Sequence, residues 1–335
     1  KLKENEWDEV KQKVKKNHPN SARMNASLAQ KIADAEAQVA DLERKIKTVS
    51  IKKIKEAIKG KEVPNFFEYA YKRMEIIKST VSYSTYKAYY AAIVKFEKWV
   101  GTRDVYFDDF SVTLLNDYKN YLSKELKNGL TTQRLSIIVL GTIFNQAIKE
   151  EIIPETMFPF KKLTLKTDNT KRLFLNKDKI LDLTQLKLIE GKKANLWRDL
   201  FLFSIYAGGL RFSDVIEMQY KHYNKNEQRI SKLIRKTGRP HQFKIGKVAI
   251  DILEKYCKEG ADNEDYIFPV IEDQKGYERS ESLRYFYTAK YNKLANWHLK
   301  KLGEKMELPF KLSFHLSRHT FATNALNNGM RIFFF

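Results

Sequence analysis

Nearly every patterned stretch of this chain has the hydrophobic spacing of an amphipathic helix, which leaves little room for an extensive sheet. Turn signals separate four such stretches in the first half, and the expected helices there are 65–78, 84–100, 113–127 and 131–150. Residues 22–48 contain no Pro or Gly and predict a further long helix, with Asn25 or Ser27 as its cap.

The second half repeats this pattern with one exception. The helices expected there are 177–185, 194–207, 211–218, 247–257, 282–301 and 315–327, with Gly329 ending the last one. Residues 220–222 lead into a short β segment, and residues 229–245 alternate apolar and basic side chains around a Thr-Gly turn. That alternation predicts a β-hairpin. The expected fold class is therefore mainly α with a small β-sheet.

Glycine and proline residues and local composition divide the chain into domains and linkers. Gly60 to Pro64 is a linker that separates residues 1–62 from an all-helical domain at 63–160. Residues 161–172 are polar, basic and aperiodic, which is typical of an exposed linker, and residues 173–335 form the last domain. The chain does not begin with Met and ends on an apolar tail, so both ends are expected to be trimmed.

The charge balance points to a polyanion partner. The net charge is +21, and residues 161–335 alone carry 34 basic and 20 acidic side chains. Nucleic acid is the first interpretation and an anionic membrane surface the weaker one, because the longest apolar run, 200–210, is too short to span a bilayer. The single cysteine, Cys257, excludes a disulfide framework and a cysteine-based zinc site. This cysteine usage fits a reducing cytoplasm.

Two short stretches about a hundred residues apart place an arginine at the end of an apolar run. They are Ala207-Gly-Gly-Leu-Arg-Phe-Ser-Asp214 and His315-Leu-Ser-Arg-His-Thr-Phe-Ala-Thr323. In the second stretch His315 precedes Arg318 by three residues and shares its helix face. A guanidinium binds two oxygens at once and stays protonated, so Arg211 and Arg318 predict a phosphate site. The alternative is a pair of surface arginines that bind acidic side chains.

Three motifs occur in an order that resembles the tyrosine recombinases, or phage-type integrases. They are Gly209-Leu-Arg-Phe-Ser-Asp214, Lys236-Thr-Gly238 and His315-Leu-Ser-Arg-His-Thr320. The resemblance covers residues 64–332 and looks closest to integrases of conjugative transposons and related mobile elements. It implies a helical, SAM-like core-binding domain and a catalytic domain that form a C-shaped clamp around duplex DNA. Residues 1–62 would be the remnant of an arm-binding region followed by the long helix.

The resemblance also implies a reaction and roles for four residues. Arg211 and Arg318 would clamp the scissile phosphate, and Lys236 would protonate the leaving 5′-oxygen. His315 would hydrogen-bond a non-bridging oxygen or assist proton transfer from the nucleophile. DNA strands would be broken and rejoined through a covalent 3′-phosphotyrosine, which integrates or excises a mobile element without a metal or cofactor. For Lys236, a solvated hairpin lysine that touches the DNA backbone remains the alternative.

Further residues receive supporting roles. Asp214 is expected to orient an active-site side chain, and His319, expected on another helix face, to pack behind the site. The expected DNA contacts are Lys161, Lys162, Lys171, Arg172, Lys232, Arg235, Arg239 and Lys244. By resemblance, the partners are double-stranded attachment-site DNA and three further copies, a homotetramer on two DNA sites. Accessory DNA-bending proteins are further candidates, at a nucleoid-associated location in a bacterial cytoplasm.

The family's nucleophile has no counterpart in the sequence. No tyrosine follows Arg318, and Tyr285, Tyr287 and Tyr291 match no nucleophile position. We therefore expect the chain as given to grip a phosphodiester without cleaving it. Two accounts stay open: the C-terminal segment is absent, or residues are skipped before the terminal phenylalanines.

Other classes of function compete with this one. A non-enzymatic DNA-binding protein derived from an integrase, with an architectural or regulatory role, remains the main alternative. A metal-dependent nuclease would need clustered carboxylates, and Asp214, Asp251 and Glu254 form no such motif. A coiled-coil scaffold would rest on residues 22–48 alone and would leave the positive charge of the second half without a role.

Overall fold

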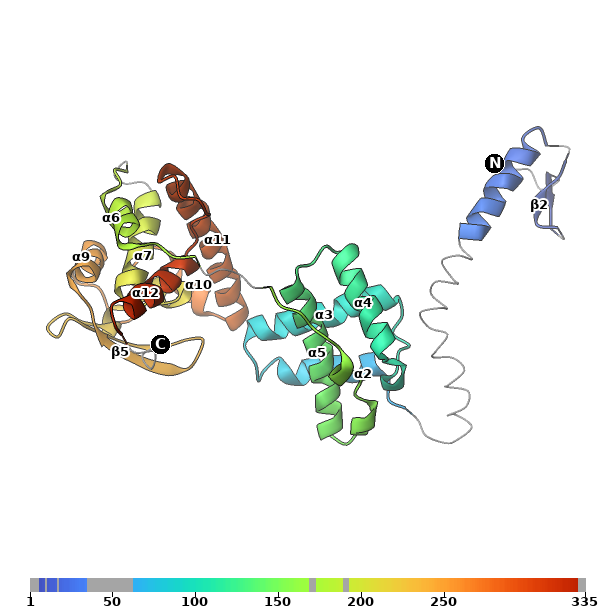
Figure 1. Cartoon of the computed structure of the whole chain (residues 1–335), viewed down its shortest axis with the longest axis horizontal. Coiled ribbons are helices and arrows are strands. Elements are labelled where there is room, and N and C mark those ends of the chain that lie inside the picture. Colours follow the sequence, from blue (N-terminus) through green and yellow to red (C-terminus); the bar gives the residue numbers. More distant parts are fainter. Residues whose placement is uncertain are drawn as a thin grey trace. The chain divides into compact units, whose positions relative to one another are not determined.

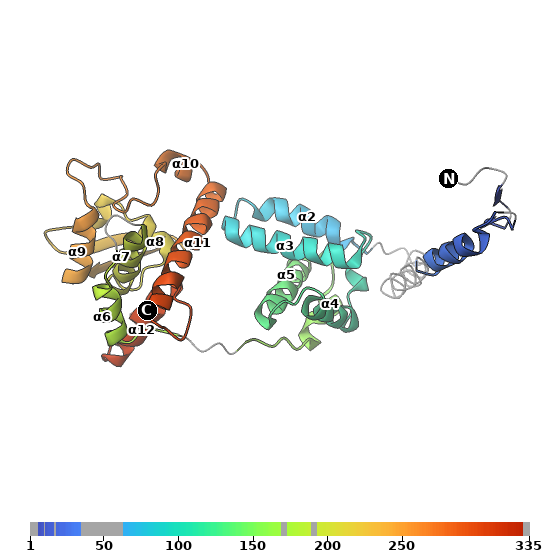
Figure 2. The same cartoon turned by 90° about the horizontal axis from the view of Figure 1, so that it is seen from above.

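The computed structural model describes residues 6–9, 11–16, 18–34, 63–168, 173–188 and 193–330. The chain divides into two compact units, Lys1–Asn169 and Thr170–Phe335. Figures 1 and 2 show both units as largely helical. In the part of the chain just defined, no helix combines the length and the apolar character needed to cross a membrane.

Four helices build the body of the first unit. They are α2 (Phe66–Ile77), α3 (Tyr83–Val100), α4 (Val112–Lys124) and α5 (Leu130–Lys149). These match the four sequence-predicted helices to within three residues at either end. Short 3-10 turns, η2 (Phe107–Asp109), η3 (Glu155–Met157) and η4 (Pro159–Lys162), follow α3 and α5.

Local chemistry explains where these helices start and what holds them together. Asn65, Ser82 and Ser111 each accept a hydrogen bond from a first-turn N–H, of α2, α3 and α4 respectively. The core is aromatic: Phe66 lies 6.0 Å from Phe96 and 5.9 Å from Phe144, measured between ring centroids. The unit is thus a helical bundle packed around buried phenylalanines.

The N-terminal segment corrects the expected cap. A two-stranded hairpin of β1 (Trp7–Asp8) and β2 (Lys13–Val14) precedes a helix that covers 21–34. Asn25 cannot cap this helix because its carboxamide bonds both backbone groups of Val14, at 2.8 and 2.9 Å. Ser27 lies inside the helix, because the helix begins six residues before it. The remainder of the predicted helix, 35–48, lies outside the described residues.

The second unit surrounds a buried helix with other helices and a small sheet. Its helices are α6 (Lys177–Gln185), α7 (Lys193–Tyr206), α8 (Phe212–Ile216), α9 (Lys247–Tyr256), α10 (Gln274–Glu278), α11 (Glu281–Lys305) and α12 (His315–Asn327). All but α10 were expected from the sequence. Helix α7 packs against α9, α11 and α12. The contact with α12 brings residues more than a hundred positions apart into one site.

The predicted hairpin is confirmed and gains a third strand. After the 3-10 turn η5 (Tyr220–His222), β3 (Tyr223–Asn224), β4 (Arg229–Ile234) and β5 (Arg239–Lys244) form an antiparallel sheet in the order β3-β4-β5. Ile234 pairs with Arg239, so residues 235–238 form the turn, and Gly238 has the positive φ of 64°. Strands β4 and β5 and this turn are together called the hairpin.

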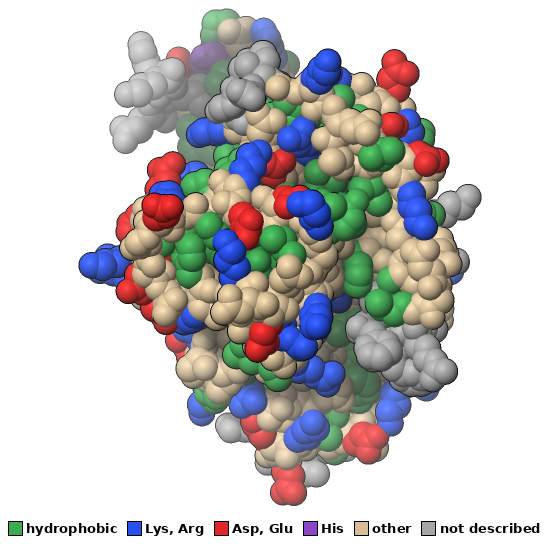
Figure 3. All heavy atoms as spheres, turned by 90° about the vertical axis from the view of Figure 1, so that its left-hand side faces the viewer, with side chains coloured by type: hydrophobic (Ala, Val, Ile, Leu, Met, Phe, Trp, Pro, Cys, Tyr) green, Lys and Arg blue, Asp and Glu red, His purple; other side chains and the backbone are tan. Residues whose placement is uncertain are grey.

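Basic and acidic side chains are mixed on the face drawn in Figure 3. Lys and Arg lie between Asp, Glu and apolar side chains there, so this side of the molecule is no uniform basic surface.

Candidate active site

One cavity collects the four residues to which the sequence gives catalytic roles. It has a volume of about 390 Å³, and its lining includes Arg211, Lys236, His315 and Arg318. These residues come from the start of α8, the hairpin turn and the first turn of α12. The structure therefore brings three separated motifs to a single concave site.

The turn before α8 sets the place of Arg211. Gly208 and Gly209 have φ values of 71° and 67°, which reverse the chain after α7. A Cβ on Gly209 would lie 2.8 Å from the ring of Phe321 on α12, so only glycine allows this close approach. The buried hydroxyl of Ser204 on α7 donates to the carbonyl of Leu210 at 2.7 Å, which fixes the turn.

Arg318 reaches the same turn from the other side. Its Nη1 donates to the carbonyl oxygen of Gly209 at 2.8 Å. Partial burial lowers the pKa of Arg318, and the positive charge of Arg211 lowers it further. Among the residues that the structure describes, neither arginine has a carboxylate ion-pair partner. The two guanidinium groups therefore form a positive site that favours an anion such as phosphate.

His315 begins α12 and remains accessible to solvent. Partial burial lowers its pKa, and the nearby charges of His319, Arg318, Lys236 and Arg211 lower it further. The imidazole is therefore neutral near pH 7, with one nitrogen able to donate and the other able to accept a proton.

The position of His319 differs from expectation. It follows His315 by one helical turn, and the two rings meet edge to face with centroids 4.5 Å apart. The expectation of a different helix face was wrong, because residues at i and i+4 lie on the same face. His319 contacts the predicted catalytic histidine directly.

Asp214 contacts the hairpin. It is fully buried, and its Oδ1 accepts a hydrogen bond from the backbone N–H of Arg235 at 3.2 Å. Burial raises the pKa of this carboxyl group, and the Arg235 N–H, Lys232 and Arg211 oppose that rise. Because Arg235 directly precedes Lys236, Asp214 fixes the start of the turn that carries the exposed lysine.

Three polar residues of α11 also line the cavity and were not singled out from the sequence. They are Thr288, Asn292 and Asn296. The Oδ1 of Asn296 accepts from the backbone N–H of Phe314 at 2.7 Å, immediately before His315. No motif marks these residues, because their position depends on how α11 and α12 both pack against α7.

Burial corrects one predicted DNA contact, Lys232, and ion pairs hold a second, Arg235. Lys232 is only 7% exposed, and its Nζ donates to the carbonyl oxygen of Glu217 at 2.8 Å. In a strand, side chains alternate between faces, so Lys232 shares the inner face of Ile230 and Ile234. This period of two was visible in the sequence. Arg235 does not project freely either, because its guanidinium binds two carboxylates.

The other predicted DNA contacts are exposed or lie outside the described residues, and their role stays a prediction. Arg239 and Lys244 are exposed on β5, and Lys161 and Lys162 are exposed on η4, with Lys161 paired to Glu155. Lys171 and Arg172 fall outside the described part of the chain.

Three known protein families match consecutive segments of this chain. Residues 173–334 match the phage integrase family, residues 65–164 match the phage integrase SAM-like domain, and residues 1–55 match an arm DNA-binding domain. A similar curated protein is the tyrosine recombinase XerA of Pyrococcus horikoshii, 26% identical over 68% of this chain and 72% of that protein.

Solved structures share the fold. The Tn1549 transposon integrase in complex with circular intermediate DNA is 18% identical, with a TM-score of 0.58 over 80% of this chain and 89% of that chain. A lambda integrase tetramer bound to a Holliday junction is 16% identical, with a TM-score of 0.56 over 100% of this chain and 93% of that chain. The three motif stretches meet in one cavity, and two phage integrase domain families match residues 65–164 and 173–334, so this chain belongs to the phage integrase family of tyrosine recombinases.

Proposed function

We propose that this chain is a site-specific DNA recombinase that breaks and rejoins strands through a covalent 3′-phosphotyrosine, for integration or excision of a mobile element. The observation that carries the proposal is the convergence of Arg211, Lys236, His315 and Arg318 on one cavity. The site offers positive charge, a neutral imidazole and an exposed ammonium group, which together suit phosphoryl transfer.

The four side chains divide the tasks of the proposed reaction. A tyrosine oxygen attacks phosphorus, and the bond from phosphorus to the 5′-oxygen breaks. Arg211 and Arg318 bind the non-bridging oxygens, whose negative charge grows as the attack proceeds. His315 accepts the tyrosine proton, or hydrogen-bonds one of these oxygens while the tyrosine proton passes to water, and Lys236 donates a proton to the departing 5′-oxygen. The tyrosine linkage conserves the phosphodiester energy for rejoining.

The source of the nucleophile is part of the proposal. No tyrosine follows Arg318 in the printed sequence. We propose that the attacking tyrosine belongs to residues outside that sequence, and that the printed chain alone binds DNA without cleaving it. If the chain instead has a non-enzymatic DNA-binding role, it should also bind DNA. It should then fail to cleave DNA even when a tyrosine-bearing segment is added.

The remaining assignments follow from the family and are equally proposals. Residues 1–62, 63–160, 161–172 and 173–335 would act as arm-binding region, core-binding domain, linker and catalytic domain on duplex attachment-site DNA. Four copies would assemble on two DNA sites, by analogy with the lambda integrase, which forms a tetramer on a Holliday junction. Accessory DNA-bending proteins would assist at the nucleoid of a bacterial cytoplasm.

A suicide-substrate assay tests the enzyme against the DNA-binding alternative. The chain, extended by a C-terminal segment that carries the tyrosine, is incubated with nicked attachment-site DNA in the presence of a metal chelator. Denaturing gels should show a slow covalent protein–DNA adduct, and the printed chain alone should show none. Binding of the same DNA by the extended chain without any adduct would overturn the enzymatic proposal in favour of a DNA-binding role.

A further inference from the structure

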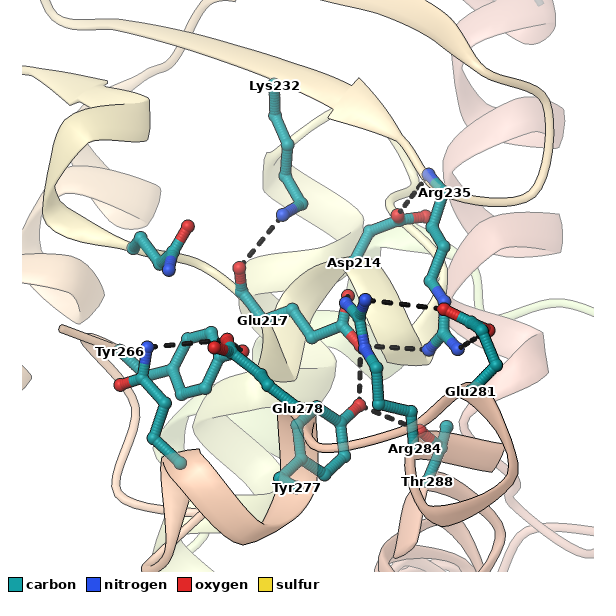
Figure 4. A network of polar contacts seen from close by, with 12 residues as sticks. Asp214, Glu217, Lys232, Arg235, Tyr266, Tyr277, Glu278, Glu281, Arg284 and Thr288 are labelled. Carbon is teal, nitrogen blue, oxygen red and sulfur yellow. Dashed lines mark hydrogen bonds and ion pairs between the residues drawn. The ribbon is translucent and has the colours of Figure 1, made fainter. Parts of the chain in front are cut away.

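A cluster of charged side chains lies beneath the hairpin turn and belongs to none of the family motifs used above (Figure 4). Glu217, at the end of α8, is only 4% exposed. Its Oε1 accepts from Arg235 Nη1 at 2.9 Å, and its Oε2 pairs with Arg284 Nη2 at 3.1 Å. A carboxylate buried to this extent needs such partners, and these two arginines supply them.

A second carboxylate binds the same two arginines from the solvent side. The Oε2 of Glu281 lies 2.9 Å from Arg235 Nη2, and its Oε1 lies 3.5 Å from Arg284 Nη1. The Glu281 side chain is 62% exposed. The four residues Glu217, Arg235, Glu281 and Arg284, called here the hairpin anchor, balance two negative charges with two positive ones.

The hairpin anchor connects three of the elements that frame the cavity. Glu217 comes from α8, which begins just after Arg211; Arg235 comes from the hairpin turn; and Glu281 and Arg284 come from α11. The hydroxyl group of Tyr277 bonds both Glu217 and Thr288, and Thr288 lines the cavity. The anchor therefore reaches the cavity wall through a continuous set of hydrogen bonds.

Lys236 depends on this support for its position. It is the residue after Arg235, it is exposed, and among the described residues no acidic side chain pairs with it. A lysine stem is flexible, so only the backbone of the turn can aim it at the cavity. Asp214 holds that backbone at the Arg235 N–H, and Glu217 and Glu281 hold the Arg235 guanidinium.

We propose that the hairpin anchor positions Lys236 to protonate the leaving 5′-oxygen, with Glu217 and Glu281 acting as positioning residues through Arg235. This inference rests on the proposed recombinase function and goes beyond it, because the four anchor residues lie outside the cavity lining and act on one step only. Loosening the anchor should impair proton delivery and should leave the phosphate contacts of Arg211 and Arg318 in place.

The chemistry of the leaving group distinguishes a loss of proton delivery from a loss of phosphate contacts. A 5′-bridging sulfur departs as a stable thiolate and needs no protonation, whereas a 5′-alkoxide does. A nicked attachment-site substrate with sulfur in place of the bridging 5′-oxygen should therefore bypass Lys236. The same substrate still requires charge stabilisation on the non-bridging oxygens, so it should not bypass Arg211.

The test compares the rates of adduct formation on the oxygen and sulfur substrates for the extended chain. Because a general acid contributes about 10²–10⁴-fold, Lys236→Ala should slow the oxygen substrate by at least about 100-fold. Glu281→Gln should slow adduct formation on the oxygen substrate by about 10-fold, because Glu217 still holds the Arg235 guanidinium. Glu217→Gln should slow it by more, because the buried carboxylate is then lost. All three variants should approach the wild-type rate on the sulfur substrate, and Arg211→Ala should stay slow on both.

Matched controls guard against a folding artefact. Glu217→Gln alters a buried ion cluster and could lower stability, so the exposed Glu281→Gln is the decisive variant. Asp251→Asn removes a similarly exposed carboxylate, which pairs with Lys247 at 2.9 Å on α9, and should leave both rates unchanged. DNA affinity, measured in parallel, should be the same for Glu281→Gln and Asp251→Asn.

Each outcome has one meaning. If the unsubstituted extended chain forms no adduct on either substrate, the proposed function fails before the anchor is tested. If the unsubstituted chain does form adducts, two results refute the positioning role. One is a Glu281→Gln rate on the oxygen substrate equal to that of the unsubstituted chain. The other is a Glu281→Gln rate that is equally slow on the oxygen and sulfur substrates. Failure of sulfur to restore Lys236→Ala would refute it as well, because Lys236 would then not be the acid that the anchor serves.

Discussion

Arg318 on α12 donates a hydrogen bond to the carbonyl oxygen of Gly209, 109 residues earlier in the chain, at 2.8 Å. This bond joins the two arginine motifs, because Gly209 ends the turn that leads to Arg211. The buried hydroxyl groups of Ser204 and Ser317, 2.7 Å apart, connect the same two segments beneath the surface. The phosphate site is thus held together by contacts between α7, its following turn and α12.

The close approach at Gly209 predicts a large cost for a single methyl group. In Gly209→Ala the Cβ would meet the Phe321 ring at 2.8 Å and the residue would keep a positive φ of 67°. Overpacking and backbone strain together should lower the free energy of unfolding by about 2–5 kcal/mol. Urea denaturation measures this change.

Gly238→Ala is the matched control for that variant. Gly238 has a φ of 64°, and no atom lies within 4 Å of the position that an alanine methyl group would take, so only the backbone cost of about 1–2 kcal/mol applies. Equal losses for the two variants would show that the contact with Phe321 does not constrain the turn.

The half-buried His222 predicts a pH dependence of stability. Burial, with the charges of Lys232 and Lys221, lowers the pKa of His222 to about 4 from its ordinary 6.5. Its Nδ1 also accepts a hydrogen bond from the Gln219 N–H at 3.0 Å, which protonation would abolish. Between pH 6.5 and 4 the unfolded state therefore binds more protons than the folded state, and stability falls as pH falls.

The variant His222→Gln should remove that part of the acid sensitivity. The wild type should lose at most about 3 kcal/mol more than the variant between pH 7 and 4. Urea unfolding at several pH values measures the difference, with the exposed His241→Gln as control. Identical pH profiles for wild type and His222→Gln would contradict the assigned pKa shift.

The buried and exposed basic residues of the hairpin predict different effects on DNA binding. If Arg239 and Lys244 each contact a phosphate, replacing both with alanine should weaken binding and reduce the slope of log K against log salt concentration by about 2. Lys232→Met should leave the slope unchanged, because Lys232 is buried against Glu217. A reduced slope for Lys232→Met would contradict its buried position. An unchanged slope for the double variant would show that Arg239 and Lys244 contact no phosphate.

Sequence reasoning predicted what depends on local pattern. Helices such as Lys177–Gln185 and His315–Asn327 were predicted residue for residue, because caps and hydrophobic spacing act within one segment. The hairpin followed from alternation around a Thr-Gly turn. The four catalytic candidates were found through motifs, and the structure adds that they share a cavity.

What sequence reasoning missed depends on long-range packing. The pairing of Glu217 with Arg284 joins residues 67 positions apart, and no local signal specifies it. The same holds for Asn296, whose carboxamide holds the start of α12. Lys232 and His319 are different, because the period of a strand already places Lys232 beside Ile230 and Ile234, and the period of a helix places His319 beside His315.

The most direct test of the account measures adduct formation by Arg211→Ala and Arg318→Ala in the extended chain, with DNA affinity measured alongside. Each variant should lose about 10²–10³-fold in rate, because each removes a preorganised donor to the developing charge. Most of the DNA affinity should remain, since many other phosphate contacts support binding. Adduct formation at a near-wild-type rate by either variant would contradict the assignment of this cavity as the active site.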